Sequence, residues 1–103
     1  MYKLCVYIPL SHLEQVKKAL FEAGAGKIGY YDNCCWQTQG KGQFRPLINS
    51  QPYIGQTGKV ETVDEVKVEL VVEDALIKEV IASMKLAHPY EEPAYDAWLL
   101  ANI

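Results

Sequence analysis

Several features that would point to a function directly are missing from this 103-residue sequence. No apolar run approaches the roughly 20 residues that a membrane-spanning helix needs, so we expect no membrane association. The sequence contains no phosphate-binding glycine motif, no H-E-x-x-H and no C-x-x-C. The ten basic residues are scattered and the net charge is −3, so nothing predicts nucleic-acid binding.

The three cysteines do not predict a disulfide framework, because their number is odd. Cys34 and Cys35 are neighbours that would point to opposite faces of a strand, which suits neither a disulfide nor a shared metal. The N-terminus does not have the pattern of a secretory signal. We therefore expect a single domain over residues 1-103 in the cytoplasm, with reduced thiols.

The first 24 residues read as one strand and one helix. Residues 2–8 alternate apolar and other residues, which predicts a strand with one buried face. Ser11 and Glu14 have the spacing of a capping box and predict the start of a helix there. Gly24 is the expected residue just past the end of that helix.

The same pattern returns after residue 66. Residues 66–72 alternate again, and an apolar stripe at helical spacing follows Glu73. Pro89 disfavours helical backbone at His88 and must end this helix. A last strand is predicted over 94–100, so residues 88–93 form a rigid, polar and aromatic connector.

The middle of the chain is rich in glycine. Residues 30–39 are compatible with a strand, and Gly40-Lys-Gly42 predicts a tight turn that returns through 43–45. Residues 47–57 read as a long loop, a feature that is usually functional or packed against a partner. A short edge strand is expected over 59–65.

This order of elements predicts the α+β, ferredoxin-like βαββαβ fold, an antiparallel sheet with both helices on one face. Two helices can cover only one side of such a sheet. Tyr7, Trp36, Val71 and Trp98 make the other side partly apolar. We therefore expect a second copy of the chain to cover it, in a homo-oligomer.

Five spaced motifs, which together extend over most of the chain, resemble the middle domain of the NIF-three-like proteins, the YqfO and YbgI group. His88-Pro-Tyr-Glu91 also resembles the CutA proteins, which have a PII-like trimeric architecture. The motifs are Ala25-Gly-Lys-Ile-Gly-Tyr-Tyr-Asp-Asn-Cys34, Gly40-Lys-Gly-Gln-Phe-Arg-Pro46, Pro52-Tyr-Ile-Gly55, Gly58-Lys-Val-Glu61 and Ala87-His-Pro-Tyr-Glu-Glu-Pro-Ala-Tyr-Asp96.

The resemblance implies the same CutA/PII-like fold, with a hairpin and a glycine-rich loop insertion, and it favours a trimer over a dimer. In the larger family the di-metal ligands lie in flanking halves, which this chain lacks. The chain is thus expected to be a freestanding insert domain. The resemblance implies a fold and a regulatory role here, but not that metal cluster or a GTP cyclohydrolase activity.

His88 is the sharpest candidate for chemistry. It could bind a divalent metal ion if Glu91 and Cys34 converged on it, but no ligand spacing supports this. The alternative, which we favour over the metal role, is that His88 closes the helix by hydrogen bonding to backbone or to a carboxylate. Adjacent Glu91 and Glu92 diverge in an extended segment and make a poor acid/base pair. Further candidates for ligand or interface contacts are Tyr90, Glu92, Tyr95, Trp98, Trp36 and Tyr53.

Three hypotheses follow. The leading one is a non-enzymatic PII/CutA-like binding or regulatory module that acts as a homo-oligomer and requires no cofactor. The second is a CutA-like protein that binds a divalent metal ion through His88 and nearby carboxylates or thiols. The third is a small-molecule enzyme with its site in a cleft between subunits.

Overall fold

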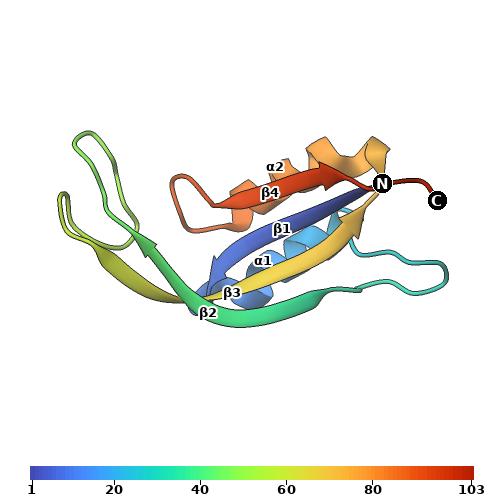
Figure 1. Cartoon of the computed structure of the whole chain (residues 1–103), viewed down its shortest axis with the longest axis horizontal. Helices are drawn as coiled ribbons and strands as arrows, with labels where there is room; N and C mark the ends of the chain where they lie inside the picture. The colour runs from blue at the N-terminus through green and yellow to red at the C-terminus, as the bar shows by residue number, and fades with distance from the viewer.

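The computed structural model describes all residues, 1–103. Four strands form one antiparallel sheet in the order β2-β3-β1-β4, and two helices lie on one of its faces (Figure 1). The strands are β1 (Tyr2–Pro9), β2 (Trp36–Phe44), β3 (Glu61–Val72) and β4 (Tyr95–Leu99), and the helices are α1 (Leu13–Glu22) and α2 (Ile77–Ala87). The predicted βαββαβ order and the α+β fold class are confirmed.

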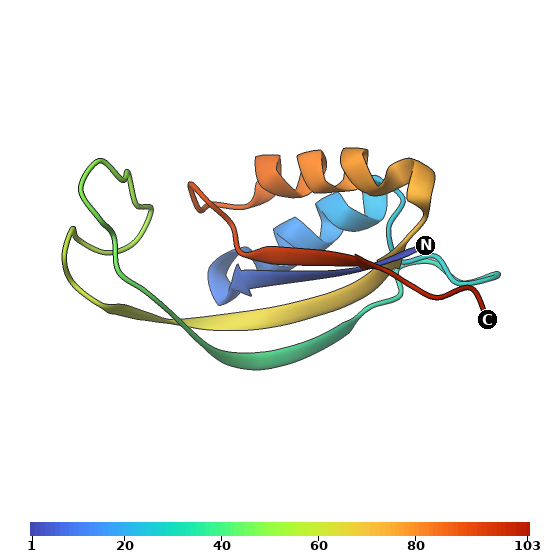
Figure 2. The ribbon, with the colours of Figure 1, turned by 45° about the horizontal axis from the view of Figure 1, so that its top comes forward.

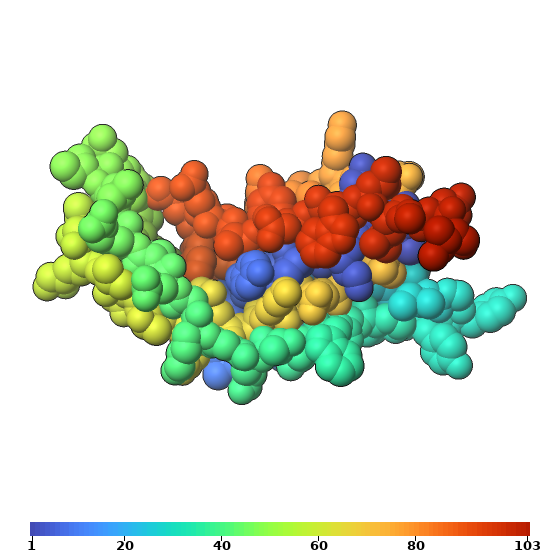
Figure 3. Space-filling view, viewed as in Figure 1, coloured from blue at the N-terminus to red at the C-terminus, as the bar shows by residue number.

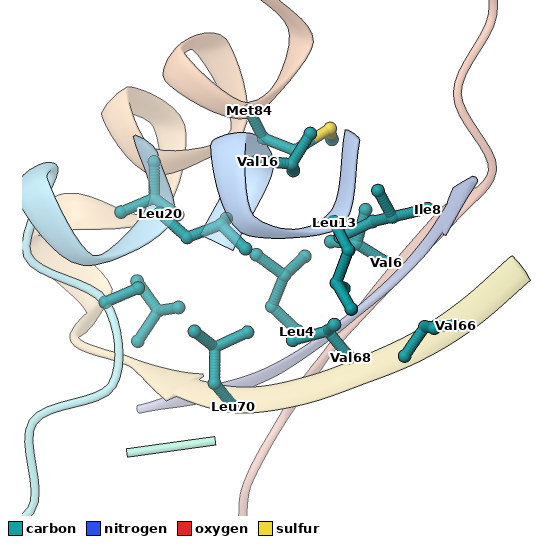
Figure 4. Packing of buried hydrophobic residues seen from close by; sticks show 13 residues of the cluster. Leu4, Val6, Ile8, Leu13, Val16, Leu20, Val66, Val68, Leu70 and Met84 are labelled. Carbon is teal, nitrogen blue, oxygen red and sulfur yellow. The ribbon is translucent and has the colours of Figure 1, made fainter. Parts of the chain in front are cut away.

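The core lies between the helices and the two central strands (Figure 4). Alternate residues of β1 and β3 face the helices, and their register places Leu4 opposite Leu70 and Val6 opposite Val68. Val16 and Leu20 of α1 and Met84 of α2 are fully buried against them. The strand alternation and the helical stripe in the sequence therefore describe one shared interior.

Both helices begin later than the sequence indicates, α1 at Leu13, one residue later than a cap at Ser11 predicts, and α2 at Ile77, about one turn after Glu73. Short 3-10 turns at Leu10–His12 and Asp74–Leu76 precede α1 and α2. The predicted capping box is wrong, because the Ser11 hydroxyl lies 2.8 Å from the His12 ring and not on a helix N–H. The predicted ends are confirmed: Gly24 has a φ of +105° just after α1, and His88 leaves the helical region.

The middle of the chain differs most from expectation. β2 runs without interruption through Gly40 and Gly42, and neither glycine has a positive φ, so the predicted tight turn is wrong. The strand predicted over 59–65 is not separate but is the first part of β3, one strand of 12 residues that begins at Glu61 and pairs with β1 as well as β2 only from Glu65 onward. Nine consecutive pairs with β3 hold β2 extended.

β2 and β3 continue past the end of β1 as a two-stranded arm. Pro9 pairs with Glu65, so the earlier residues of β3 pair with β2 alone. The arm and its tip (residues 45–60) give the molecule an elongated shape, 46 × 24 × 23 Å (Figure 2). Neither helix is long and apolar enough to cross a membrane.

Candidate functional site

The connector between α2 and β4 (residues 88–94) lies at the end of the sheet from which the arm projects. His88 is its first residue: its N–H still donates to the Met84 carbonyl at 2.9 Å, while its ψ of 136° ends the helix. Pro89 prevents a further turn of helix. The connector thus starts from a fixed point and passes beside the arm tip (Figure 3).

The His88 side chain is a buried anchor with both ring nitrogens engaged. Nδ1 accepts a hydrogen bond from the Tyr90 N–H at 3.2 Å, and Nε2 lies 2.8 Å from the Tyr7 carbonyl oxygen. The Tyr90 contact assigns the neutral form with its proton on Nε2, which donates to Tyr7. Burial lowers the pKa of His88, partly opposed by the Tyr7 carbonyl and the charge of Glu65.

Tyr90 links the connector to β3. Its hydroxyl donates a 2.9 Å hydrogen bond to Glu65 Oε2. Burial, followed by this bond and the negative charge of Glu65, raises the pKa of Tyr90. The phenol is therefore a hydrogen-bond donor at physiological pH, and it holds the Glu65 carboxylate in place.

Gly42 makes room for that carboxylate. A Cβ atom at Gly42 would overlap with the Glu65 carboxylate, whereas one at Gly40 would meet nothing within 4 Å. The extended β2 backbone at Gly42 thus lets Glu65 lie across the neighbouring strand and reach Tyr90. This is a packing requirement, not the turn that the sequence suggested.

A cavity of about 370 Å³ opens between the arm tip and the connector. The rings of Phe44, Tyr53 and Tyr90 line it, together with the carboxylates of Glu65, Glu91 and Glu92. The Gln51 N–H donates to Glu91 Oε2 at 2.7 Å and ties the tip to the connector. A second, more open cavity of about 430 Å³ shares Glu65 with the first.

The candidate residues from the sequence fall into three places. Tyr90, Tyr53, Glu91 and Glu92 meet at the first cavity. Trp36 and Trp98 lie on the sheet face away from the helices, opposite Glu69 and Lys3. Tyr95 pairs with the core residue Val6 and has the Lys85 ammonium 5.3 Å from its ring.

The three predicted metal ligands do not converge within one chain. The backbone N–H of Cys34 donates a hydrogen bond to the Gly26 carbonyl, in the loop between α1 and β2, which lies at the opposite end of the sheet from the connector (Figure 1). No group of three or more His, Cys, Asp or Glu side chains is arranged to hold a metal ion. A metal site that includes His88 stays a prediction, and it would have to replace one of the two hydrogen bonds of the ring.

Glu65, Phe44 and Arg45 belong to this cavity, although the sequence did not single them out. Phe44 lies on β2, Arg45 follows it, and Glu65 lies on β3. All three are therefore distant in sequence from the connector. Phe44 and Arg45 fall in one of the motifs quoted above, so that motif was a signal for them. Nothing comparable marks Glu65.

Comparison with known proteins gives close relatives for the whole chain. It is 46% identical over 102 residues to a GTP cyclohydrolase 1 type 2 homolog of Halalkalibacterium halodurans, covering 99% of this chain and 27% of that protein. The chain therefore spans about a quarter of the length of the curated relatives that it matches. No protein-family model matches it.

Solved structures show the same fold. A Bacillus cereus protein related to NIF3 matches 98% of this chain and 26% of that chain, with 42% identity and a TM-score of 0.82. The divalent cation tolerance protein CutA from Archaeoglobus fulgidus matches 99% of this chain and 86% of that chain, with a TM-score of 0.69. At 21% identity the second likeness shows the fold alone. The recognised similarity to NIF3-related and CutA/PII-like proteins is thus confirmed.

Proposed function

We propose that the chain is a non-enzymatic binding or regulatory module that acts as a homo-oligomer, with a trimer favoured over a dimer. The observation that carries this proposal is the sheet face that the helices leave uncovered. Trp36 is 71% exposed there and Trp98 is 47% exposed, and both lie on edge strands. Large exposed aromatic side chains on one face are typical of an interface.

The rest of that face fits contact with a second copy. Tyr7 and Val71 are half-buried on the central strands, between the two tryptophans. Lys67 and Glu69 alternate with them, so the face offers charges of both signs. A face that carries both signs can contact a second copy without strong repulsion. In a two-fold dimer it would contact the same face of that copy, and in a trimer a different patch.

The non-enzymatic part rests on how the best candidates for acid/base chemistry are used. Both ring nitrogens of His88 are hydrogen-bonded to backbone groups, and the Tyr90 hydroxyl donates a hydrogen bond to Glu65. Groups held in this way stabilise the connector and are poorly placed to exchange protons with a substrate. The name of the longer relatives, GTP cyclohydrolase 1 type 2 homolog, is therefore not extended to an activity of this chain.

A cytoplasmic location is part of the proposal. Cys5, Cys34 and Cys35 are free thiols, and Cys5 is buried among strand residues. Burial raises the pKa of Cys5, so it remains a protonated, unreactive thiol. Free thiols of this kind suit a reducing compartment.

Light scattering coupled to gel filtration tests the assembly. At micromolar concentration we expect a mass that is a multiple of the 11.6 kDa chain, and three chains if the trimer forms. Trp98→Lys should reduce that mass, whereas Glu79→Lys, a substitution at an exposed position of α2 on the other face of the sheet, should leave it unchanged. A native protein that elutes as a single chain contradicts the proposal.

A further inference from the structure

The cavity between the arm tip and the connector has walls made of aromatic rings. The Tyr90 ring centroid lies 5.9 Å from that of Phe44 and 6.4 Å from that of Tyr53. The planes are inclined by 56° and 46°, so the rings pack against one another in a tilted arrangement, and all three line the cavity. Aromatic rings that line a cavity can attract a cation through the negative potential of their faces.

The charges around the same cavity are mainly negative. Glu65, Glu91 and Glu92 line it, against the single cation Arg45. Tyr90 fixes Glu65, and the Gln51 N–H fixes Glu91. Arg45 forms no ion pair and lies over none of the rings, so the chain's own cation does not neutralise this site.

From this combination we infer that the cavity binds a small organic cation that carries an ammonium or guanidinium group. The inference rests on the proposed function, a binding module, and names its class of ligand. The aromatic lining attracts a cation, and the carboxylates compensate its charge. An anion would meet three carboxylates, and a neutral apolar ligand would desolvate them without pairing them.

The size and openness of the cavity agree with a ligand site. Its volume of about 370 Å³ lies within the usual range for small-molecule pockets. Tyr53 remains 54% exposed, so part of its ring is free to contact a ligand.

Choline is a suitable probe, and its neutral isostere 3,3-dimethylbutan-1-ol is the matched control, because the two differ essentially in charge. Titrations of ¹⁵N-labelled full chain would follow amide shifts by NMR. We expect choline to shift the resonances of Phe44, Tyr53 and Tyr90, and the isostere to bind at least about tenfold more weakly.

Two variants test whether the residues that line the cavity contribute to choline binding. Tyr53→Leu removes one ring face at an exposed position, and Glu65→Gln removes a charge while retaining an acceptor for the Tyr90 hydroxyl. Each should weaken choline binding by about fivefold or more. Tyr30→Leu, at a fully exposed tyrosine outside the cavity, should leave the affinity unchanged.

Equal affinity for choline and its isostere, or shifts confined to residues outside the cavity, would overturn the inference. Choline binding that survives both Tyr53→Leu and Glu65→Gln in folded protein would overturn it as well. Light scattering on the same samples separates the two proposals. An oligomer that does not bind choline refutes the cation site alone, whereas a monomer that binds it refutes only the proposed assembly.

Discussion

His88 shows how one buried side chain can organise a loop. Its ring joins three segments: the end of α2, the Tyr7 carbonyl of β1 and the Tyr90 N–H of the connector. Only 6% of the residue is exposed, so protonation would place a charge where little water can reach it. A protonated ring would also lose the acceptor that Tyr90 uses.

The stability of the fold should therefore depend on the charge of His88. Its folded pKa lies below the ordinary value of 6.5, so below pH 6.5 the unfolded chain binds the proton more readily than the native state. The free energy of unfolding should fall as the pH drops from 6.5 through the folded pKa. Urea denaturation between pH 7.5 and 5 would measure this.

His88→Gln provides the control for that experiment. This variant is expected to be less stable at neutral pH by about 1–3 kcal/mol, because it cannot satisfy both backbone partners. It should also lose most of the dependence on pH in this range. An unchanged slope would assign the effect to a group other than His88.

Gly42, Glu65 and Tyr90 form a second unit at the residue scale. The Gly42→Ala methyl group would collide with the Glu65 carboxyl and force this flexible side chain away from Tyr90. We expect a folded protein that is less stable by about 1 kcal/mol, the typical contribution of one hydrogen bond. Chemical denaturation measures the difference.

Two matched variants test whether the loss of stability in Gly42→Ala comes from the hydrogen bond between Tyr90 and Glu65. Gly40→Ala introduces the same methyl group in open space and should cost clearly less. In a Tyr90→Phe background, Gly42→Ala should also cost less, since both changes act on one bond. Full additivity of the two changes would show that Gly42 does not act through Tyr90.

The sequence identified one half of the candidate site and missed the other. Tyr90 and Glu91 were conspicuous because they follow a proline that ends a helix. Glu65 looks like any solvent-facing residue of an alternating strand. Its role depends on a glycine in the neighbouring strand, and only the pairing of β2 with β3 reveals that relation.

At the scale of elements, the helix ends are the most strongly determined features. Gly24 has a φ of +105°, and a Cβ atom there would lie 2.8 Å from Leu76 Cδ1. Gly24→Ala should thus lower the free energy of unfolding by about 1–2 kcal/mol, through backbone strain and contact with Leu76. Thermal unfolding followed by circular dichroism would show this loss.

Gly58→Ala is the comparison for that prediction. Its φ of +80° imposes a similar backbone cost, but nothing lies within 4 Å of the added methyl group. It should therefore destabilise the protein less than Gly24→Ala. Equal losses would mean that the contact with Leu76 contributes nothing.

The strands and helices at both ends of the chain were predictable because local signals and tertiary packing agree there. Alternation, Gly24 and Pro89 each mark a feature that the fold retains. In the middle of the chain, local signals and tertiary packing disagree. Gly40 and Gly42 look like a turn in isolation, but pairing with β3 extends them, and a neighbouring side chain decides which of them is needed.

At the scale of the whole molecule, the sheet has one face that the chain covers and one that it leaves open. The helices bury the alternating residues of β1 and β3 on their side. On the other side, aromatic residues lie between charges of both signs. The proposed oligomer follows from this asymmetry. The quantity to be measured is therefore the solvent accessibility of the open face.

Acrylamide quenching of tryptophan fluorescence tests this directly, because the only two tryptophans, Trp36 and Trp98, both lie on the open face. At micromolar concentration we predict quenching well below that of free tryptophan, rising when dilution separates the subunits. Quenching as strong as that of free tryptophan at every concentration would show that this face meets water and not a second chain.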